Sequence, residues 1–292
     1  RRGNRCGNCL HGVAVRVTDI GARGVIHESI TPGISRLVVP TDTLPPATST
    51  NAWLLGREAL TVVDPGASDP AVQEAVVKAL STFTVARIVL THHHPDHTSG
   101  AQHLSQATGA PIAGHPDTRG FFPGLDTTLE DGDTLTVGTE QWQVLHTPGH
   151  AHGHICLLRQ TDGYAVVGDL LAGEGTILIA PPEGHLATYL HSLRRLQRRQ
   201  VVHALPAHGP VLDAQSALEM YLTHRHARTA QVNACLAGGL ATPLAMAAQI
   251  YPHLPAPFRP VAAHQLRAHL TWLIEHQTAY RMPDAADHFG PL

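Results

Sequence analysis

The sequence has few aromatic residues, few cysteines and no long apolar run. Aromatic residues make up 4% of the 292 residues, which leaves few stacking platforms for the bases of single-stranded nucleic acid. Four cysteines are too few for a disulfide framework at this length. No apolar run approaches the roughly 20 residues that span a bilayer. No apolar segment follows the basic N-terminus, as one would in a secretory signal. We therefore expect a cytoplasmic protein with no membrane partner.

The cysteines that are present are of two kinds. Cys6 and Cys9 form a Cys-x-x-Cys motif, which is either half of a zinc ribbon or part of a terminal segment. Cys156 lies in an apparent strand and Cys235 on an apparent helix, so both are predicted to be small buried hydrophobic residues. The sequence also lacks the Gly-x-Ser-x-Gly elbow of many serine hydrolases, so it offers no nucleophile of that kind.

Composition and length are those of a globular protein with one large core, or one core and a small appendage. Hydrophobic residues make up 43% of the chain and charged residues 15%. Residues 1–182 hold 11 basic and 17 acidic side chains, a net charge of −6, and residues 183–292 hold 9 and 6, a net charge of +3. This mild asymmetry permits an anionic partner near the C-terminal part without requiring one.

A dense group of potential metal ligands follows an apolar strand. The run Ile88–Leu90 leads into Thr91-His92-His93-His94-Pro95-Asp96-His97, a His-x-His-x-Asp-His motif. Imidazoles and carboxylates are ligands that zinc prefers. At the end of a strand, His92 and His94 can reach one metal while Asp96 and His97 reach a neighbouring one. His93, between two ligands, should point to the opposite side.

Three further single ligands follow in order along the chain. His150 ends Thr147-Pro148-Gly149-His150, Asp169 follows Gly168, and His208 lies in Pro206-Ala207-His208-Gly209. Each comes just after an apolar stretch. With 23 histidines, chance clusters are expected, but chance does not explain four motifs in order with Gly or Pro beside the ligand in three of them.

These motifs resemble the metallo-β-lactamase superfamily from about residue 37 to about residue 209. The resemblance implies a dinuclear centre of two Zn²⁺, with Fe or Mn tolerated by the same ligands, and hydrolysis by a hydroxide shared between the metals. It places His92, His94 and His150 on the first metal, Asp96, His97 and His208 on the second, and Asp169 between both. It also implies that Asp64 orients a metal ligand through a hydrogen bond.

The expected fold is α/β (α+β), an αββα sandwich with a small C-terminal helical appendage that resembles a winged helix. Residues 1–212 form the catalytic domain, with 1–30 as a frayed or accessory segment, and 213–292 the helical domain. Strands are expected at 35–39, 52–55, 60–63, 134–137, 141–145, 155–158, 164–167 and 176–179. C-terminal helices are expected from Asp213 to Gly238, over 242–250 and from Pro260, and 280–292 shows no clear strand pair.

Asp96 and Asp169 are the predicted catalytic residues, because both would hold the metals and Asp96 could also accept the proton of the nucleophile. Glu174, Tyr189 and His154 are candidate substrate contacts, and rim or packing roles are the alternative for each. Apolar residues on the appendage could form a homodimer face or the appendage's own core.

Three functions stay open at this point. A bridging Asp169 argues against true β-lactamase activity and suits thioesterases of the glyoxalase II type, lactonases and nucleases. Three longer stretches, at residues 44–51, 168–176 and 224–228, resemble the lactamase-β-2-like group, and this resemblance favours cleavage of single-stranded RNA. Six arginines on two apparent helices could then bind phosphate: Arg194, Arg195, Arg198, Arg199, Arg225 and Arg228. The alternative is hydrolysis of a small thioester, lactone or ester, and the third is a non-catalytic metal-binding module.

Overall fold

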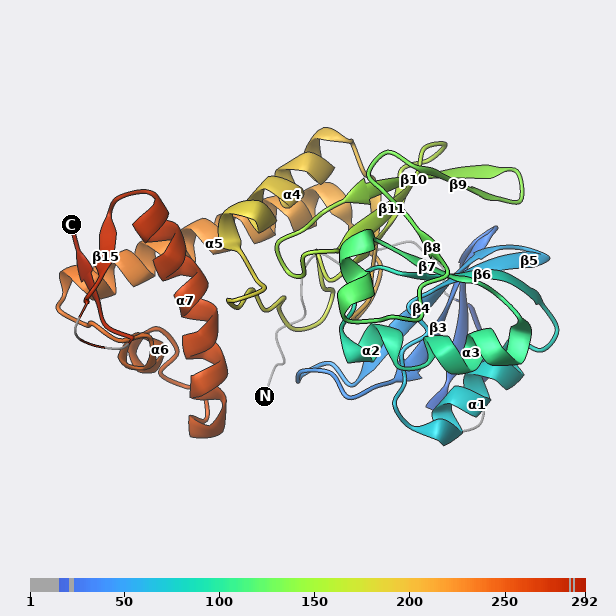
Figure 1. Cartoon of the computed structure of the whole chain (residues 1–292), viewed down its shortest axis with the longest axis horizontal. Coiled ribbons are helices and arrows are strands. Elements are labelled where there is room, and N and C mark those ends of the chain that lie inside the picture. The colour runs from blue at the N-terminus through green and yellow to red at the C-terminus, as the bar shows by residue number, and fades with distance from the viewer. Residues whose placement is uncertain (1–15, 21–23, 284, 286) are drawn as a thin grey trace.

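The computed structural model describes residues 16–20, 24–283, 285 and 287–292, so the Cys6 and Cys9 motif lies outside the described residues. Two sheets lie face to face with helices on their outer sides, and a separate group of C-terminal helices lies at one end of the molecule (Figure 1). This arrangement is the αββα sandwich with a helical appendage that the sequence predicts. Within the described residues, no helix is both long and apolar enough to cross a membrane.

The first sheet contains eight strands in sequence order. They are β1 (Arg16–Ile20), β2 (Ile26–Thr31), β3 (Ile34–Pro40), β4 (Ser49–Gly56), β5 (Ala59–Val63), β6 (Thr84–Leu90), β7 (Ile112–Gly114) and β8 (Thr127–Thr128). Pairing is antiparallel from β1 to β5 and parallel from β5 to β8. The parallel part requires crossovers, which α1 (Pro70–Ala79), α2 (Pro95–Thr98) and α3 (Ala101–Thr108) supply; the short 3₁₀ helix η2 (Pro116–Gly120) follows β7.

The second sheet contains six strands in the order β14-β13-β12-β11-β10-β9. They are β9 (Thr134–Val137), β10 (Glu140–His146), β11 (Ile155–Arg159), β12 (Tyr164–Gly168), β13 (His203–Pro206) and β14 (Leu212–Asp213). Only β12 and β13 pair in parallel, and α4 (Leu186–Arg198) forms their crossover. Helix α5 (Ala214–Ala237) packs beside α4 and runs on into the appendage (Figure 1).

Helix boundaries follow the capping residues. The Asp69 carboxylate accepts a hydrogen bond from an N–H of the first turn of α1, and Asp213 does the same for α5. Gly109 ends α3 in the left-handed conformation with φ 74°, and Gly238 ends α5. The start and end of α5 agree with the helix predicted from Asp213 to Gly238.

Apolar side chains form three layers of core across the sandwich and a fourth in the appendage. One cluster packs the first sheet against α1 and α3, one fills the space between the sheets, and one packs the second sheet against α4 and α5. Trp53, Trp142 and Leu205 are fully or nearly fully buried between the sheets. Cys156 and Cys235 are buried free cysteines, as predicted.

The appendage has its own core and a strand pair that the sequence did not indicate. Helices α6 (Pro243–Ile250), η3 (Ala256–Phe258) and α7 (Arg259–Glu275) are followed by β15 (Ala279–Arg281) and β16 (Phe289–Pro291). The last two strands pair antiparallel, which corrects the expectation of no clear strand pair at 280–292. Three-residue strands are too short to show an alternating pattern. The buried stripe of α7, including Leu266 and Leu270, packs within the appendage core.

One other expectation is corrected. Residues 176–179 form no strand: Ile177 and Ile179 are buried, but their backbone bonds to side chains of the C-terminal helices instead of to a neighbouring strand. Within the described part of residues 1–30, β1 is the edge strand of the first sheet, and β2 pairs with β1 on one side and β3 on the other. Burial of Val25 and Ile30 attaches this part to the core.

Candidate metal centre

The seven predicted metal ligands lie together where strands of both sheets end. His92 and His94 follow β6, and Asp96 and His97 lie on α2, directly after that strand. The other three residues, His150, Asp169 and His208, follow β10, β12 and β13 of the second sheet. Strand-end loops of the two facing sheets thus supply one group of side chains.

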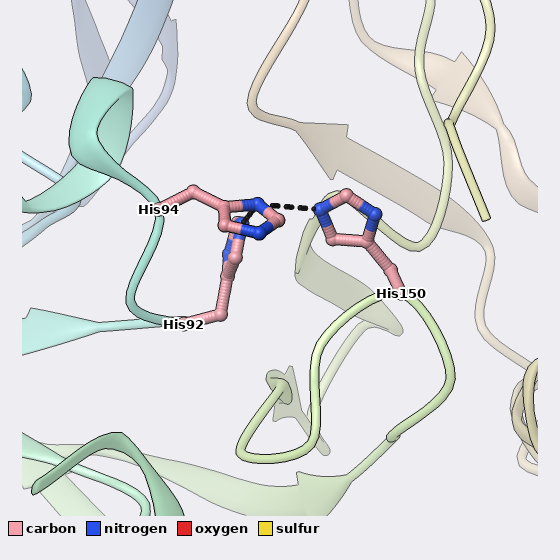
Figure 2. Close-up of side chains that lie close together, drawn as sticks. All are labelled: His92, His94 and His150. Carbon is pink, nitrogen blue, oxygen red and sulfur yellow. Dashed lines mark hydrogen bonds between the residues drawn. The ribbon is translucent and has the colours of Figure 1, made fainter. Parts of the chain in front are cut away.

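Three histidines form a first cluster (Figure 2). The His94 Nδ1 atom lies 2.9 Å from His92 Nε2 and 2.9 Å from His150 Nε2. His92 and His94 come from one loop, and His150 approaches from the opposite loop. Three imidazole nitrogens this close together are a donor set suited to one zinc ion.

A second cluster contains Asp96, His97 and His208. The Asp96 Oδ2 atom lies 3.4 Å from His208 Nε2 and 3.8 Å from His97 Nε2. Asp169 lies between the clusters: its Oδ1 is 3.4 Å from His208 Nε2 and 3.6 Å from His97 Nε2, while its Oδ2 is 3.5 Å from His150 Nε2. One carboxylate thus presents one oxygen to each cluster.

Atoms without partners show that these residues fit a metal. His97 Nε2, His208 Nε2 and Asp169 Oδ1 are buried and make no hydrogen bond among the described residues. A buried polar atom that lacks a partner is costly, and such atoms converging on one point are expected where an ion binds. The two buried His/Asp clusters are consistent with a dinuclear metal site.

The opposite ring nitrogens of these histidines are held by the protein. His97 Nδ1 lies 2.9 Å from Asp64 Oδ2, His150 Nδ1 lies 2.8 Å from the Leu178 carbonyl, and His208 Nδ1 lies 2.9 Å from the Ser49 carbonyl. Each of these acceptors fixes the proton on Nδ1 and leaves Nε2 free to bind metal.

Asp64 has the contacts that the resemblance implies. Besides His97, its carboxylate accepts hydrogen bonds from the Thr91 N–H at 2.7 Å and the Thr91 hydroxyl at 2.6 Å. The Thr91 hydroxyl is in turn 3.1 Å from His92 Nδ1. Asp64 therefore supports ligands of both clusters, from a left-handed backbone position with φ 54°.

Glu183 is a site residue that the sequence analysis missed. Its Oε2 lies 3.4 Å from His94 Nε2, and its Oε1 lies 3.3 Å from His93 Nε2. His93 therefore shares the Glu183 carboxylate with His94, and its ring stacks on Phe121 with ring centroids 3.8 Å apart. Burial alone would raise the pKa of Glu183, but the hydrogen bonds from His93 and His94 lower it below its ordinary value. No local spacing rule links Glu183 to the histidine motif.

Protonation differs between the two clusters. Burial lowers the pKa of His92 well below its ordinary value, and the neighbouring histidines lower it further. Burial also lowers the pKa of His150 to about 4, against the opposing effect of Asp169. Both rings are therefore neutral at pH 7, which is the form that binds metal.

The second cluster holds protons when no metal is bound. Burial alone would lower the pKa of His97, but Asp64, Asp169 and Asp96 raise it to about 9. At His208, burial alone would likewise lower the pKa, but the Asp169 and Asp96 carboxylates raise it to about 11. Burial alone would raise the pKa of Asp96, yet His97 and His208 lower it to about 2. The same histidines hold the pKa of Asp169 below its ordinary value despite burial.

A cavity of about 430 Å³ opens onto both clusters. Four carboxylate residues line it, namely Asp42, Asp96, Asp169 and Glu174, and among the described residues no Lys or Arg does so. Apolar lining comes from two loops, at Leu44 and Ala47 and at Ile177 and Leu178. Glu174 is exposed at the rim, where the sequence analysis expected a substrate contact.

The other two candidate substrate contacts do not line this cavity. His154 is fully buried; its Nε2 accepts the Asp169 N–H at 3.1 Å and its Nδ1 lies 2.9 Å from the Thr147 hydroxyl. Tyr189 is also fully buried and donates its hydroxyl hydrogen to the Leu170 carbonyl at 2.8 Å. The polar atoms of both side chains bond to the protein itself. Both residues therefore support the segment around Asp169 on the side that does not face the cavity.

Three of the six arginines of the RNA hypothesis are held by contacts within the protein. Arg225 is buried and donates to the Ile177 carbonyl. Arg195 pairs with Asp131 at 2.8 Å, and Arg228 lies over the Tyr251 ring. These side chains have structural partners in different parts of the protein.

Comparison with known proteins identifies the family. The sequence matches the metallo-beta-lactamase superfamily over residues 45–211, more than half of the chain, and the chain belongs to this superfamily. As a member with a buried His/Asp cluster, it is a metal-dependent hydrolase. The resemblance that the motifs indicated is thereby confirmed.

Its relatives carry several names. A lactamase-like protein, vrtG, of Penicillium aethiopicum is 29% identical over 73% of this chain and 69% of its own length. A hydroxyacylglutathione hydrolase of Rhodospirillum rubrum is 35% identical over 51% of this chain and 54% of its own. An atrochrysone carboxyl ACP thioesterase of Aspergillus fumigatus is 30% identical over 63% of this chain and 43% of its own. The chain thus spans about half the length of the latter two.

Solved structures show the same fold. A beta-lactamase domain protein from Burkholderia ambifaria superposes with a TM-score of 0.80 at 20% identity, covering 95% of this chain and 97% of that one. A metallo-beta-lactamase family protein from Thermus thermophilus gives 0.75 at 24% identity, covering 90% and 100%. The coverage includes most of the appendage, so the whole architecture recurs.

Proposed function

We propose that this protein is a dinuclear zinc-dependent hydrolase of thioesters of small or carrier-bound acyl groups. His92, His94 and His150 hold one metal, Asp96, His97 and His208 the other, and Asp169 lies between them. The observation that carries this assignment is that Asp169 Oδ2 faces His150 while its Oδ1 faces His97 and His208. Iron or manganese would fit the same donor atoms.

Bound zinc ions supply Lewis acidity and lower the pKa of water to about 7. The chain's own residues set the geometry for this chemistry. Asp64 and the carbonyls of Leu178 and Ser49 accept hydrogen bonds from Nδ1 of His97, His150 and His208, so that Nε2 is the nitrogen of each ring that would bind metal. Asp96 lines the cavity and is placed to orient the attacking water and accept its proton.

The cavity favours a small substrate over a polyanion. Carboxylates line the cavity and, among its described lining residues, no Lys or Arg does, so it does not attract phosphodiesters other than through the metals themselves. Burial of Arg225 and the pairing of Arg195 with Asp131 remove support for an arginine-rich RNA path. The relatives named hydroxyacylglutathione hydrolase and atrochrysone carboxyl ACP thioesterase support a thioester within the small-molecule class.

The test is turnover by the zinc-loaded protein of four probes: an acyl glutathione thioester, an acyl N-acetylcysteamine thioester, a lactone and a labelled single-stranded RNA. We expect hydrolysis of a thioester and its loss in His94→Ala. His191→Ala, at an exposed histidine of α4, is the matched control and should retain activity. RNA cleavage that falls steeply with salt, with intact thioesters, would refute the proposal.

A further inference from the structure

The segment of residues 177–185, here called the linking loop, contacts the first histidine cluster on one side. Its Leu178 carbonyl accepts a hydrogen bond from His150 Nδ1 at 2.8 Å. Its Glu183 carboxylate lies 3.4 Å from His94 Nε2. Two of the three histidines of the first cluster are therefore oriented by groups of this one loop.

The other side of the linking loop is held by α5 and the appendage helix α7. The Gln265 side-chain oxygen accepts the Ile179 N–H at 2.8 Å, and the Arg225 guanidinium donates to the Ile177 carbonyl. His264 Nε2 donates to the Pro181 carbonyl, and His185 Nε2 donates to Glu275 at 2.8 Å. Helices far along the chain thus replace the strand partner that residues 176–179 lack.

The contacts that Gln265 and Arg225 make with the linking loop are buried. Gln265 is 7% exposed and Arg225 is 1% exposed. A buried backbone N–H that loses its acceptor is destabilising because its lost contact with water is not replaced, so the Ile179 N–H confines the loop to positions that Gln265 can reach. The Leu178 carbonyl lies between the two anchored residues and has little freedom to move away from His150.

We propose that Gln265 and Arg225 are positioning residues for the first metal cluster and act through the linking loop. The C-terminal helices thereby set the orientation of His150 and His94 without touching either metal. This inference rests on the metal centre proposed above.

The test measures zinc affinity of the first cluster directly. The full chain carrying His208→Ala lacks one ligand of the second cluster and should bind one zinc, titrated against a chromophoric chelator. Adding Gln265→Met, which keeps the side-chain volume but removes the acceptor, should weaken that zinc about 10-fold, the lower end of the loss seen for partners of metal ligands. Gln265→Glu keeps an acceptor oxygen and should restore most of the affinity.

Thr229→Val is the matched control. The Thr229 hydroxyl lies 2.8 Å from His269 Nδ1, a buried contact between α5 and α7 with no bond to the linking loop. Thr229→Val should lower the thermal stability as much as Gln265→Met does, but it should leave the zinc affinity unchanged. If Gln265→Met does not fold, Gln265→Asn, one methylene too short to reach Ile179, should show the same weakening.

The outcomes separate the two proposals. Unchanged zinc affinity in folded Gln265→Met or Gln265→Asn would overturn this inference. An equal loss of zinc affinity in Thr229→Val would also overturn it. Absence of zinc binding in the unsubstituted chain would instead refute the metal centre, and this inference with it.

Discussion

Replacing Asp64 by Asn should weaken the second metal far more than its small change in shape suggests. The Asp64 Oδ2 atom accepts hydrogen bonds from two donors, His97 Nδ1 at 2.9 Å and the Thr91 hydroxyl at 2.6 Å, while Oδ1 accepts the Thr91 N–H at 2.7 Å. An Asn side chain offers one acceptor and one donor, so either orientation sets a donor against a donor. Asn tolerates the φ of 54° at this position, so the backbone should not change.

The magnitude follows from the lost hydrogen bond. Without its acceptor, His97 places its proton on Nε2, the nitrogen that faces the second cluster, and must lose it to bind metal. A hydrogen bond to a charged group contributes about 1.5–3 kcal/mol, and each 1.4 kcal/mol is about a tenfold change in affinity. We therefore expect the second zinc to bind about 10–100-fold more weakly.

Chelator competition at pH 7.5 measures this effect, with circular dichroism as a check on folding. Asp69→Asn is the matched control, because Asp69 caps α1 on the surface and Asn caps equally well. Two tightly bound zinc ions in folded Asp64→Asn, or a similar loss in Asp69→Asn, would refute the reasoning.

Three further predictions concern protonation, Asp169 and the core. The pKa values of His97 and His208 are raised to about 9 and 11, so zinc must displace a proton from each ring at pH 6–8. Zinc titrations across this pH range should therefore show an affinity that rises with pH, by up to about 100-fold per pH unit for two protons. A pH-independent second site would contradict this. His154→Ala removes the acceptor of the Asp169 N–H and should lower kcat about 10–100-fold in a folded protein, whereas unchanged kcat would contradict the positioning role. Leu205→Ala, between the sheets, should cost about 2–5 kcal/mol in urea unfolding, and a loss below about 1 kcal/mol would contradict its place in the core.

The grouping of the seven candidate ligands was predictable because its signals are local. Each of the four motifs follows an apolar strand, where the chain must leave the sheet, and in three of them Gly or Pro beside the candidate ligand marks the turn. Strand ends of two facing sheets then bring the seven residues together. The helix start at Asp213 is equally local, since the cap bonds to its own first turn.

The parts that sequence reasoning missed depend on distant partners. Ile177 and Ile179 alternate as in a strand, but their backbone partners are Arg225 and Gln265, tens of residues away. Arg225 looked like a surface cation because nothing in the helix pattern shows that it is buried. The positions of His154 and Tyr189 were missed for the same reason. Each side chain turns its polar atoms toward the segment around Asp169 instead of toward the cavity.

The most direct test of the central claim is a crystal structure of the zinc-loaded protein with anomalous scattering recorded at the zinc edge. The account predicts two zinc peaks on either side of Asp169, one bound by His92, His94 and His150 and the other by Asp96, His97 and His208. A single zinc bound by four protein ligands, or Asp169 bound to neither peak, would contradict it.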